Sequence, residues 1–197
     1  MAKKKVLNHT KLDTETILHI ENSLLKGLIP HINPPYYLLS VELVRELGDW
    51  YARIYVTKQD KRISLDECET ITREIDPIIE SITEKIDTFN NFHYNLEVSS
   101  PGLFKALRTQ REFDFYTGNE IHIQDFDISD KKQENPVIDQ KGVLISFDAQ
   151  KNELQLKNKN GDIETHIISK TAKISLYHDL SADFREDKES LSITNEE

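Results

Sequence analysis

The spacing of apolar residues changes repeatedly along the first hundred positions, and this change limits the fold more than any other feature. In residues 13–29 the apolar residues recur every three or four positions, as on one face of a helix. In residues 36–44 and 50–56 they alternate with polar ones, as in a hairpin of half-buried strands. A second helical pattern follows from Leu65, and a third strand follows over residues 93–99. The order predicts an α-β-β-α-β domain with both helices on one face of a small sheet.

Capping residues mark the expected helix ends. Asp13 or Thr14 can cap the first helix, and residues 64–67 (Ser-Leu-Asp-Glu) have the pattern of a capping box. Pro77 falls inside the second helical pattern, where a proline removes a backbone donor. We therefore expect a kink there, or the start of a further helix.

The pattern changes again after Pro101 and Gly102, where short strands replace helices. Strands are predicted over residues 120–124, 143–148, 153–157, 163–168 and 173–177. Asn160-Gly161 indicates a tight hairpin turn, and residues 129–141 read as a polar loop between the first two of these strands. Five short strands within about 60 residues predict a small β-barrel of the SH3 or Sm kind. The fold class expected for the whole chain is therefore α+β.

The length of 197 residues suits two domains of ordinary size. We expect a basic disordered tail (1–14), an N-terminal α/β domain (15–100), a C-terminal Sm-like barrel (101–180) and an acidic disordered tail (181–197). The single cysteine, Cys68, cannot form an internal disulfide, which favours a reducing compartment. No signal peptide and no long apolar run is present, so a cytoplasmic protein without a membrane partner is predicted.

The net charge of −10 is concentrated in the N-terminal half, where residues 15–100 carry 8 basic and 15 acidic side chains. Phosphate contacts need clustered Lys and Arg, so a chain this acidic is a poor general binder of nucleic acid. An acidic surface suits a basic protein partner, because complementary charge speeds encounter. The alternative is that the charge only keeps the protein soluble.

Patterns that would indicate catalysis are weak. The six glycines form no phosphate-binding loop, and the seven histidines have no metal-ligand spacing. His122 and His166 alternate with expected core residues and should face outward, while Cys68 lies on an apolar helix stripe and should be a buried, inert thiol. We therefore expect no catalytic residue, no metal and no cofactor, and a binding protein rather than an enzyme.

Residues 94–103, Tyr-Asn-Leu-Glu-Val-Ser-Ser-Pro-Gly-Leu, form an unusual segment. Physically it is a strand that runs into a tight turn, because Ser99 and Ser100 can bond nearby backbone and Pro101-Gly102 fixes the turn. A domain junction with no further role would account for these properties.

The segment Glu97-Val98-Ser99-Ser100-Pro101-Gly102-Leu103 also resembles the signature of the RimP family, the ribosome maturation factors. Further similar stretches are residues 37–44 with 52–56, residues 63–68, residues 118–123 and residues 141–144, so that the likeness covers roughly residues 15–178. The chain departs from the family after Leu103, where Phe104-Lys105-Ala106-Leu107 replaces the usual Asp-Arg-Pro-Leu. The basic group is kept as Lys105, but a planar guanidinium has become a point charge.

The resemblance implies the function. It implies an α/β N-terminal domain and an Sm-like C-terminal barrel, in a factor that binds the free small (30S) ribosomal subunit and assists its maturation. It also implies contact with the basic small-subunit ribosomal protein numbered twelve, and neither catalytic residues nor a cofactor. We expect a monomer that makes these contacts in the cytoplasm.

Two other functions stay open. The first is an Sm-like module that binds RNA directly, which would bring an rRNA contact. Candidate subunit-binding residues for either reading are Lys105, Arg108, Arg111, Lys131, Lys132 and Lys141. The second is an uncharacterised enzyme, which the weak catalytic patterns disfavour.

Overall fold

The structure is a computed structural model that describes residues 12–58, 63–86, 89, 93–125, 137–169 and 172–178. Its internal contacts divide the chain into two compact units, residues 1–101 and residues 102–197. Each unit is described by itself. Most of the two expected tails lies outside the described residues, and Thr14, placed in the basic tail from sequence, already belongs to the first helix.

The N-terminal unit has the predicted α-β-β-α-β order. Its elements are α1 (Thr14–Leu28), the 3-10 turn η1 (Ile29–His31), β1 (Tyr36–Glu46), β2 (Asp49–Lys58), α2 (Leu65–Thr83) and β3 (Asn95–Ser99). The sheet order is β1-β2-β3, with β1 and β2 antiparallel and β2 and β3 parallel. The hairpin turns at Leu47 and Gly48, whose φ values of 52° and 100° are typical of a tight turn that matches the strand twist.

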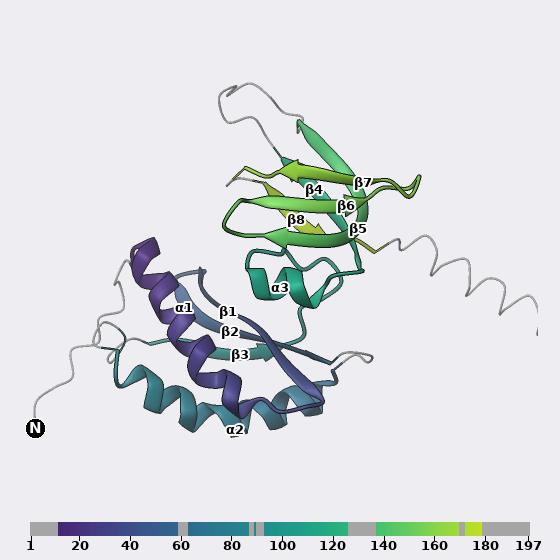
Figure 1. The fold of residues 1–197 in the computed structure, drawn as a ribbon. Coiled ribbons are helices and arrows are strands. Elements are labelled where there is room, and N and C mark those ends of the chain that lie inside the picture. The colour runs from purple at the N-terminus through teal and green to yellow at the C-terminus, as the bar shows by residue number, and fades with distance from the viewer. Residues whose placement is uncertain are drawn as a thin grey trace, which may run out of the picture. The chain divides into compact units, whose positions relative to one another are not determined.

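Both helices cover the same face of this sheet, as Figure 1 shows. The core between them consists of apolar residues at helical spacing on the helices and at alternate positions on the strands. Its fully buried members include Ile20, Leu24 and Leu28 of α1, Ala52, Ile54 and Val56 of β2, and Ile75 and Ile79 of α2. The predicted arrangement of helices on one face is confirmed.

Helix α2 continues through Pro77, so the alternative of a second helix starting there is wrong. Its capping box is present: the Ser64 hydroxyl accepts from the Glu67 amide, and the Glu67 carboxylate accepts from the Ser64 amide. Glu67 also accepts from the Lys58 ammonium (2.6 Å) and the Tyr36 hydroxyl (2.9 Å). These contacts, that from Lys58 foremost, lower the pKa of Glu67 to about 2. One carboxylate thus joins the start of α2 to β1 and β2.

The C-terminal unit is a five-stranded antiparallel sheet preceded by a short helix. Its elements are α3 (Gln110–Phe115), β4 (Glu120–Asp125), β5 (Ile138–Asp148), β6 (Glu153–Lys157), β7 (Ile163–Ile167) and β8 (Lys173–Leu176), in the strand order β7-β6-β5-β4-β8. The short helix was not predicted. Residues 138–141 were expected in the loop 129–141 but are the first residues of β5. Of the rest of that loop, the structure describes only residue 137.

The chain that enters this unit pairs with β8. The Leu107 amide donates to the Ile174 carbonyl (2.8 Å) and the Leu176 amide to the Lys105 carbonyl (2.9 Å). At the opposite edge of the sheet, the side chains of β7 point to the faces opposite to those predicted from the sequence. Ile163 and Ile167 are 61% and 67% exposed, whereas His166 lies opposite the buried Leu154. His166 was expected to face outward; its pairing with β6 places it on the inner side.

Candidate functional site

The three strands of the N-terminal sheet are joined by charged side chains at the segment singled out from sequence. Glu97 of β3 lies opposite Arg53 of β2, and its carboxylate accepts from the Arg53 Nε at 3.0 Å. The other two guanidinium nitrogens of Arg53 each donate to Glu46 of β1 at 2.8 Å. Bidentate contacts of this kind hold a guanidinium in one orientation. Arg53 therefore links the three strands, with Glu97 as its partner on β3.

The rest of the segment ends the strand and turns the chain. Ser99 is the last residue of β3 and lies opposite Tyr55. After Ser100 and Pro101, Gly102 has a φ of +75°, a conformation that a residue with a Cβ adopts only with strain. Leu103 follows with 43% of its surface exposed. The positive φ of this turn therefore explains why the segment has a glycine at position 102.

Lys105, proposed from sequence as a subunit contact, is buried. Its side chain is 5% exposed and its Nζ lies 3.3 Å from the Glu112 Oε1, an ion-pair contact whose geometry falls outside that of a hydrogen bond. Glu112 is 1% exposed, and its other oxygen accepts from the amides of Arg108 and Thr109. Because of this ion pair, the Lys105 ammonium points into the interior of the C-terminal unit. We therefore withdraw Lys105 as a subunit-binding residue.

The remaining sequence candidates do not form one patch among the described residues. Arg108 and Arg111 lie at the start of α3 with exposed side chains, and each interacts with another residue. Lys141 lies on β5, with its ammonium 4.0 Å from the centre of the Tyr177 ring. Lys131 and Lys132 lie outside the described residues.

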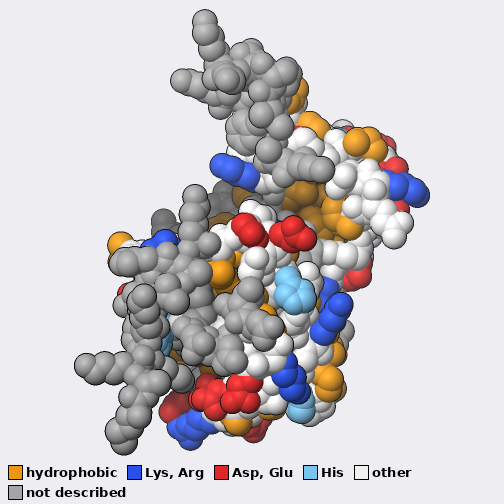
Figure 2. Space-filling model, turned by 90° about the vertical axis from the view of Figure 1, so that its left-hand side faces the viewer, with side chains coloured by type: hydrophobic (Ala, Val, Ile, Leu, Met, Phe, Trp, Pro, Cys, Tyr) orange, Lys and Arg blue, Asp and Glu red, His pale blue; other side chains and the backbone are white. Residues whose placement is uncertain are grey.

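Helix α2 carries a row of exposed carboxylates along the side that faces away from the core. We call this row the acidic stripe; it consists of Asp66, Glu69, Asp76, Glu80 and Glu84. Arg73 is the one cation within it and pairs with Glu69. The stripe is about 27 Å long, since a helix rises 1.5 Å per residue. In Figure 2 carboxylates gather at the lower end of the N-terminal unit, the level at which α2 lies in Figure 1.

Cys68 is a buried residue of α2, and burial raises the pKa of its thiol. Among the residues that the structure describes, no group of three His, Cys, Asp or Glu side chains is arranged to hold a metal ion. Within the same residues, no helix is both long and apolar enough to cross a membrane.

Comparison with known families identifies part of the chain. Residues 28–104 match the RimP N-terminal domain. The match begins at the last residue of α1 and includes β1, β2, α2, β3 and the whole segment Glu97–Leu103. The resemblance to the RimP family is confirmed over this range.

Proposed function

We propose that this chain, whose N-terminal unit is a RimP N-terminal domain, is a ribosome maturation factor that binds the free 30S subunit and assists its assembly by binding rather than by catalysis. The observation that carries the proposal is the family match over residues 28–104. The match supports a role among the ribosome maturation factors, and we propose that this task is performed on the subunit in the cytoplasm.

The acidic stripe is the surface that we assign to the protein partner. The partner implied by the family is the basic small-subunit ribosomal protein numbered twelve. Five carboxylates and one arginine along one helix face give a local excess of negative charge. Such a surface attracts a basic protein over several ångströms and orients it before contact. The acidic stripe would hold basic side chains of this protein while its rRNA site forms.

For the C-terminal unit we propose a small barrel of the Sm kind, as expected from sequence. Support comes from the order of its elements, a short helix followed by five antiparallel strands, and from the return of β8 to pair with β4. A barrel of this kind would supply a second contact with the subunit.

The partner assignment is tested with charge variants of the full chain. Neutralising three carboxylates of the acidic stripe (Asp76→Asn, Glu80→Gln and Glu84→Gln) should weaken binding of the purified basic ribosomal protein in calorimetric titration. Exposed ion pairs contribute roughly 0.2–1 kcal/mol each, so we expect a loss between about threefold and about 150-fold that shrinks as salt is added.

The matched control removes three exposed carboxylates from the C-terminal unit instead (Asp114→Asn, Glu120→Gln and Asp162→Asn). The two variants have the same net charge, so only the position of the charge differs. Equal affinity for the basic protein in both variants would contradict the assignment of the acidic stripe.

A further inference from the structure

Strand β7 forms one edge of the C-terminal sheet, with β6 as its neighbour (Figure 1). Its side chains Ile163, Thr165 and Ile167 are exposed, the two isoleucines by 61% and 67%. We call these three residues the outer row. The outer row carries no charge, although charged side chains are a common protection of edge strands. An uncharged row of β-branched residues on an edge strand is a surface that suits a further strand.

The pairing with β6 shows that the backbone of the outer row also points outward. Directly after β7, the Ile168 amide donates to the Asn152 carbonyl at 2.8 Å. Directly before β7, the Asp162 carbonyl accepts from the Asn158 amide at 2.9 Å. Because bonded and non-bonded pairs alternate along an antiparallel ladder, every second residue between these two ends, starting with Glu164, bonds to β6. The N–H and C=O groups of the outer row therefore point away from β6, and they have no backbone partner among the described residues.

The sequence of β7, Ile-Glu-Thr-His-Ile, is complementary to itself when two copies pair antiparallel about Thr165. Ile163 of each copy then lies opposite Ile167 of the other, and the two threonines lie opposite each other. All outward backbone groups of both outer rows find partners in this register, because the opposed residues are the ones whose N–H and C=O groups point outward. Cross-strand pairs of β-branched side chains add to the stability. A shift by two residues would replace the isoleucine pairs by pairs of isoleucine with threonine.

Charges beside the outer row are compatible with this pairing. Strand β6 places Lys157 next to Ile163 and Glu153 next to Ile167. In the antiparallel arrangement each isoleucine pair is flanked by Lys157 of one copy and Glu153 of the other. Opposite charges therefore end each row, and no like charges lie opposite each other.

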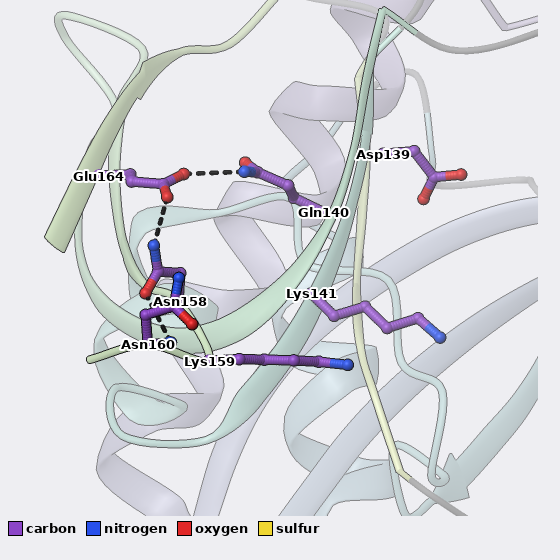
Figure 3. Close-up of a pocket in the computed structure, with 7 residues that line it drawn as sticks. All are labelled: Asp139, Gln140, Lys141, Asn158, Lys159, Asn160 and Glu164. Carbon is purple, nitrogen blue, oxygen red and sulfur yellow. Dashed lines mark hydrogen bonds between the residues drawn. The ribbon is translucent and has the colours of Figure 1, made fainter. Parts of the chain in front are cut away.

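Contacts on the inner side hold β7 in place without a partner. The Glu164 carboxylate accepts from the side-chain amides of Gln140 on β5 (2.8 Å) and Asn158 (2.5 Å), as Figure 3 shows. His166 lies opposite the buried Leu154. An edge that is already ordered loses little conformational freedom when a second strand binds.

The other edge of this sheet is already covered. Residues Lys105 and Leu107 bond to β8 through the Leu176 amide and the Ile174 carbonyl. A head-to-tail contact, in which β7 of one copy pairs with β8 of the next, would need that edge. Pairing of β7 with β7 needs only the free edge of each copy, and it closes about a twofold axis.

We propose that two copies of this chain associate through β7, which pairs antiparallel about Thr165 and joins the two C-terminal sheets into one. This dimer replaces the monomer expected from the sequence. A single pair of short strands is a small interface, so the dissociation constant lies above about 1 µM and the dimer is reversible. The proposal does not depend on binding to the 30S subunit.

The test is sedimentation equilibrium of the full chain from about 1 to about 1,000 µM, a range set by the small interface. The mean mass should rise from that of one chain, 22.9 kDa, toward twice this value. Thr165→Lys and Thr165→Glu each place like charges opposite each other at the twofold axis, which is destabilising in a strand pair. Each variant alone should dimerise at least tenfold more weakly than the natural chain. An equimolar mixture of the two should dimerise again, because lysine then lies opposite glutamate.

The recovery on mixing also shows that both variants are folded. Thr70→Lys and Thr70→Glu make the same substitutions at an exposed residue of α2 and should leave the dimer unchanged. A constant mass of one chain over the whole range would overturn the proposal, as would dimers of the Thr165 variants as tight as the natural one. A mixture that stays monomeric would overturn the register about Thr165. A natural chain that is monomeric, but whose Thr165 variants lose 30S binding, would assign the edge to a strand of another protein instead.

Discussion

Lys105 provides a sharp test of how the C-terminal unit is built. Lys105→Met keeps most of the volume of the side chain and removes its charge. The Glu112 carboxylate, 1% exposed, then loses the ammonium 3.3 Å away. Breaking a buried ion pair by removing one partner costs about 3–5 kcal/mol, because an uncompensated charge remains buried. A whole domain is stable by only about 5–15 kcal/mol, so this loss should be large and easy to measure.

The assay is amide hydrogen exchange, which reports each unit separately. Amides of β4 and β8 should lose about 3–5 kcal/mol of protection in Lys105→Met. The unfolding transition followed by fluorescence of Trp50, the only tryptophan, should stay unchanged because this residue belongs to β2. Lys157→Met removes an exposed lysine of the same unit and should cost no more than about 0.5 kcal/mol.

A second variant tests the pairing itself. Adding Glu112→Gln to Lys105→Met removes the negative charge that the single variant leaves without its lysine. The glutamine keeps an oxygen that can accept from the amides of Arg108 and Thr109. Part of the lost stability should therefore return. A cost of Lys105→Met no larger than that of Lys157→Met, or a double variant no more stable than the single one, would refute this reasoning.

Three further predictions concern single residues. Glu67→Gln should destabilise the N-terminal unit at neutral pH. Because Glu67 has a folded pKa near 2, below its ordinary value of 4.5, its contribution is present above about pH 4.5 and is lost as the pH falls toward 2, so chemical denaturation should show the two proteins converging in that range. Gly142→Ala should cost about 1–3 kcal/mol in thermal unfolding, since the new Cβ would lie 2.5 Å from the Lys157 carbonyl oxygen. Cys68, which is 7% exposed and has a raised thiol pKa, should react with a thiol reagent only at the rate at which the unit opens; reaction as fast as that of a free peptide would contradict its burial.

Local sequence signals explain most of what was predictable in the fold. The capping box at Ser64 and Glu67 and the alternation in β1 and β2 depend on neighbours in the chain, and the structure confirms them. Helix α3 was missed because six residues are too few for a periodic pattern. Thr109 and Glu112, which form its capping box, repeat the spacing of Ser64 and Glu67 and would have located it.

The candidate site depended on contacts that no local pattern contains. The alternation of residue types in β7 does not indicate which side chains face inward. The pairing of β7 with β6 determines this, and it leaves Ile163 and Ile167 exposed. Lys105 looked like a surface cation until its contact with Glu112 placed it in the interior. Sequence reasoning therefore located most of the elements and the family, while the neighbours of each charged side chain required the fold.

The central claim is that this chain binds the small subunit before translation begins. The most direct measurement is sedimentation of the full chain with isolated 30S subunits and with 70S ribosomes, at low and at moderate salt. We expect the protein to migrate with 30S subunits and to remain unbound in the presence of 70S ribosomes. Migration with neither particle, or equal migration with both, would contradict the account.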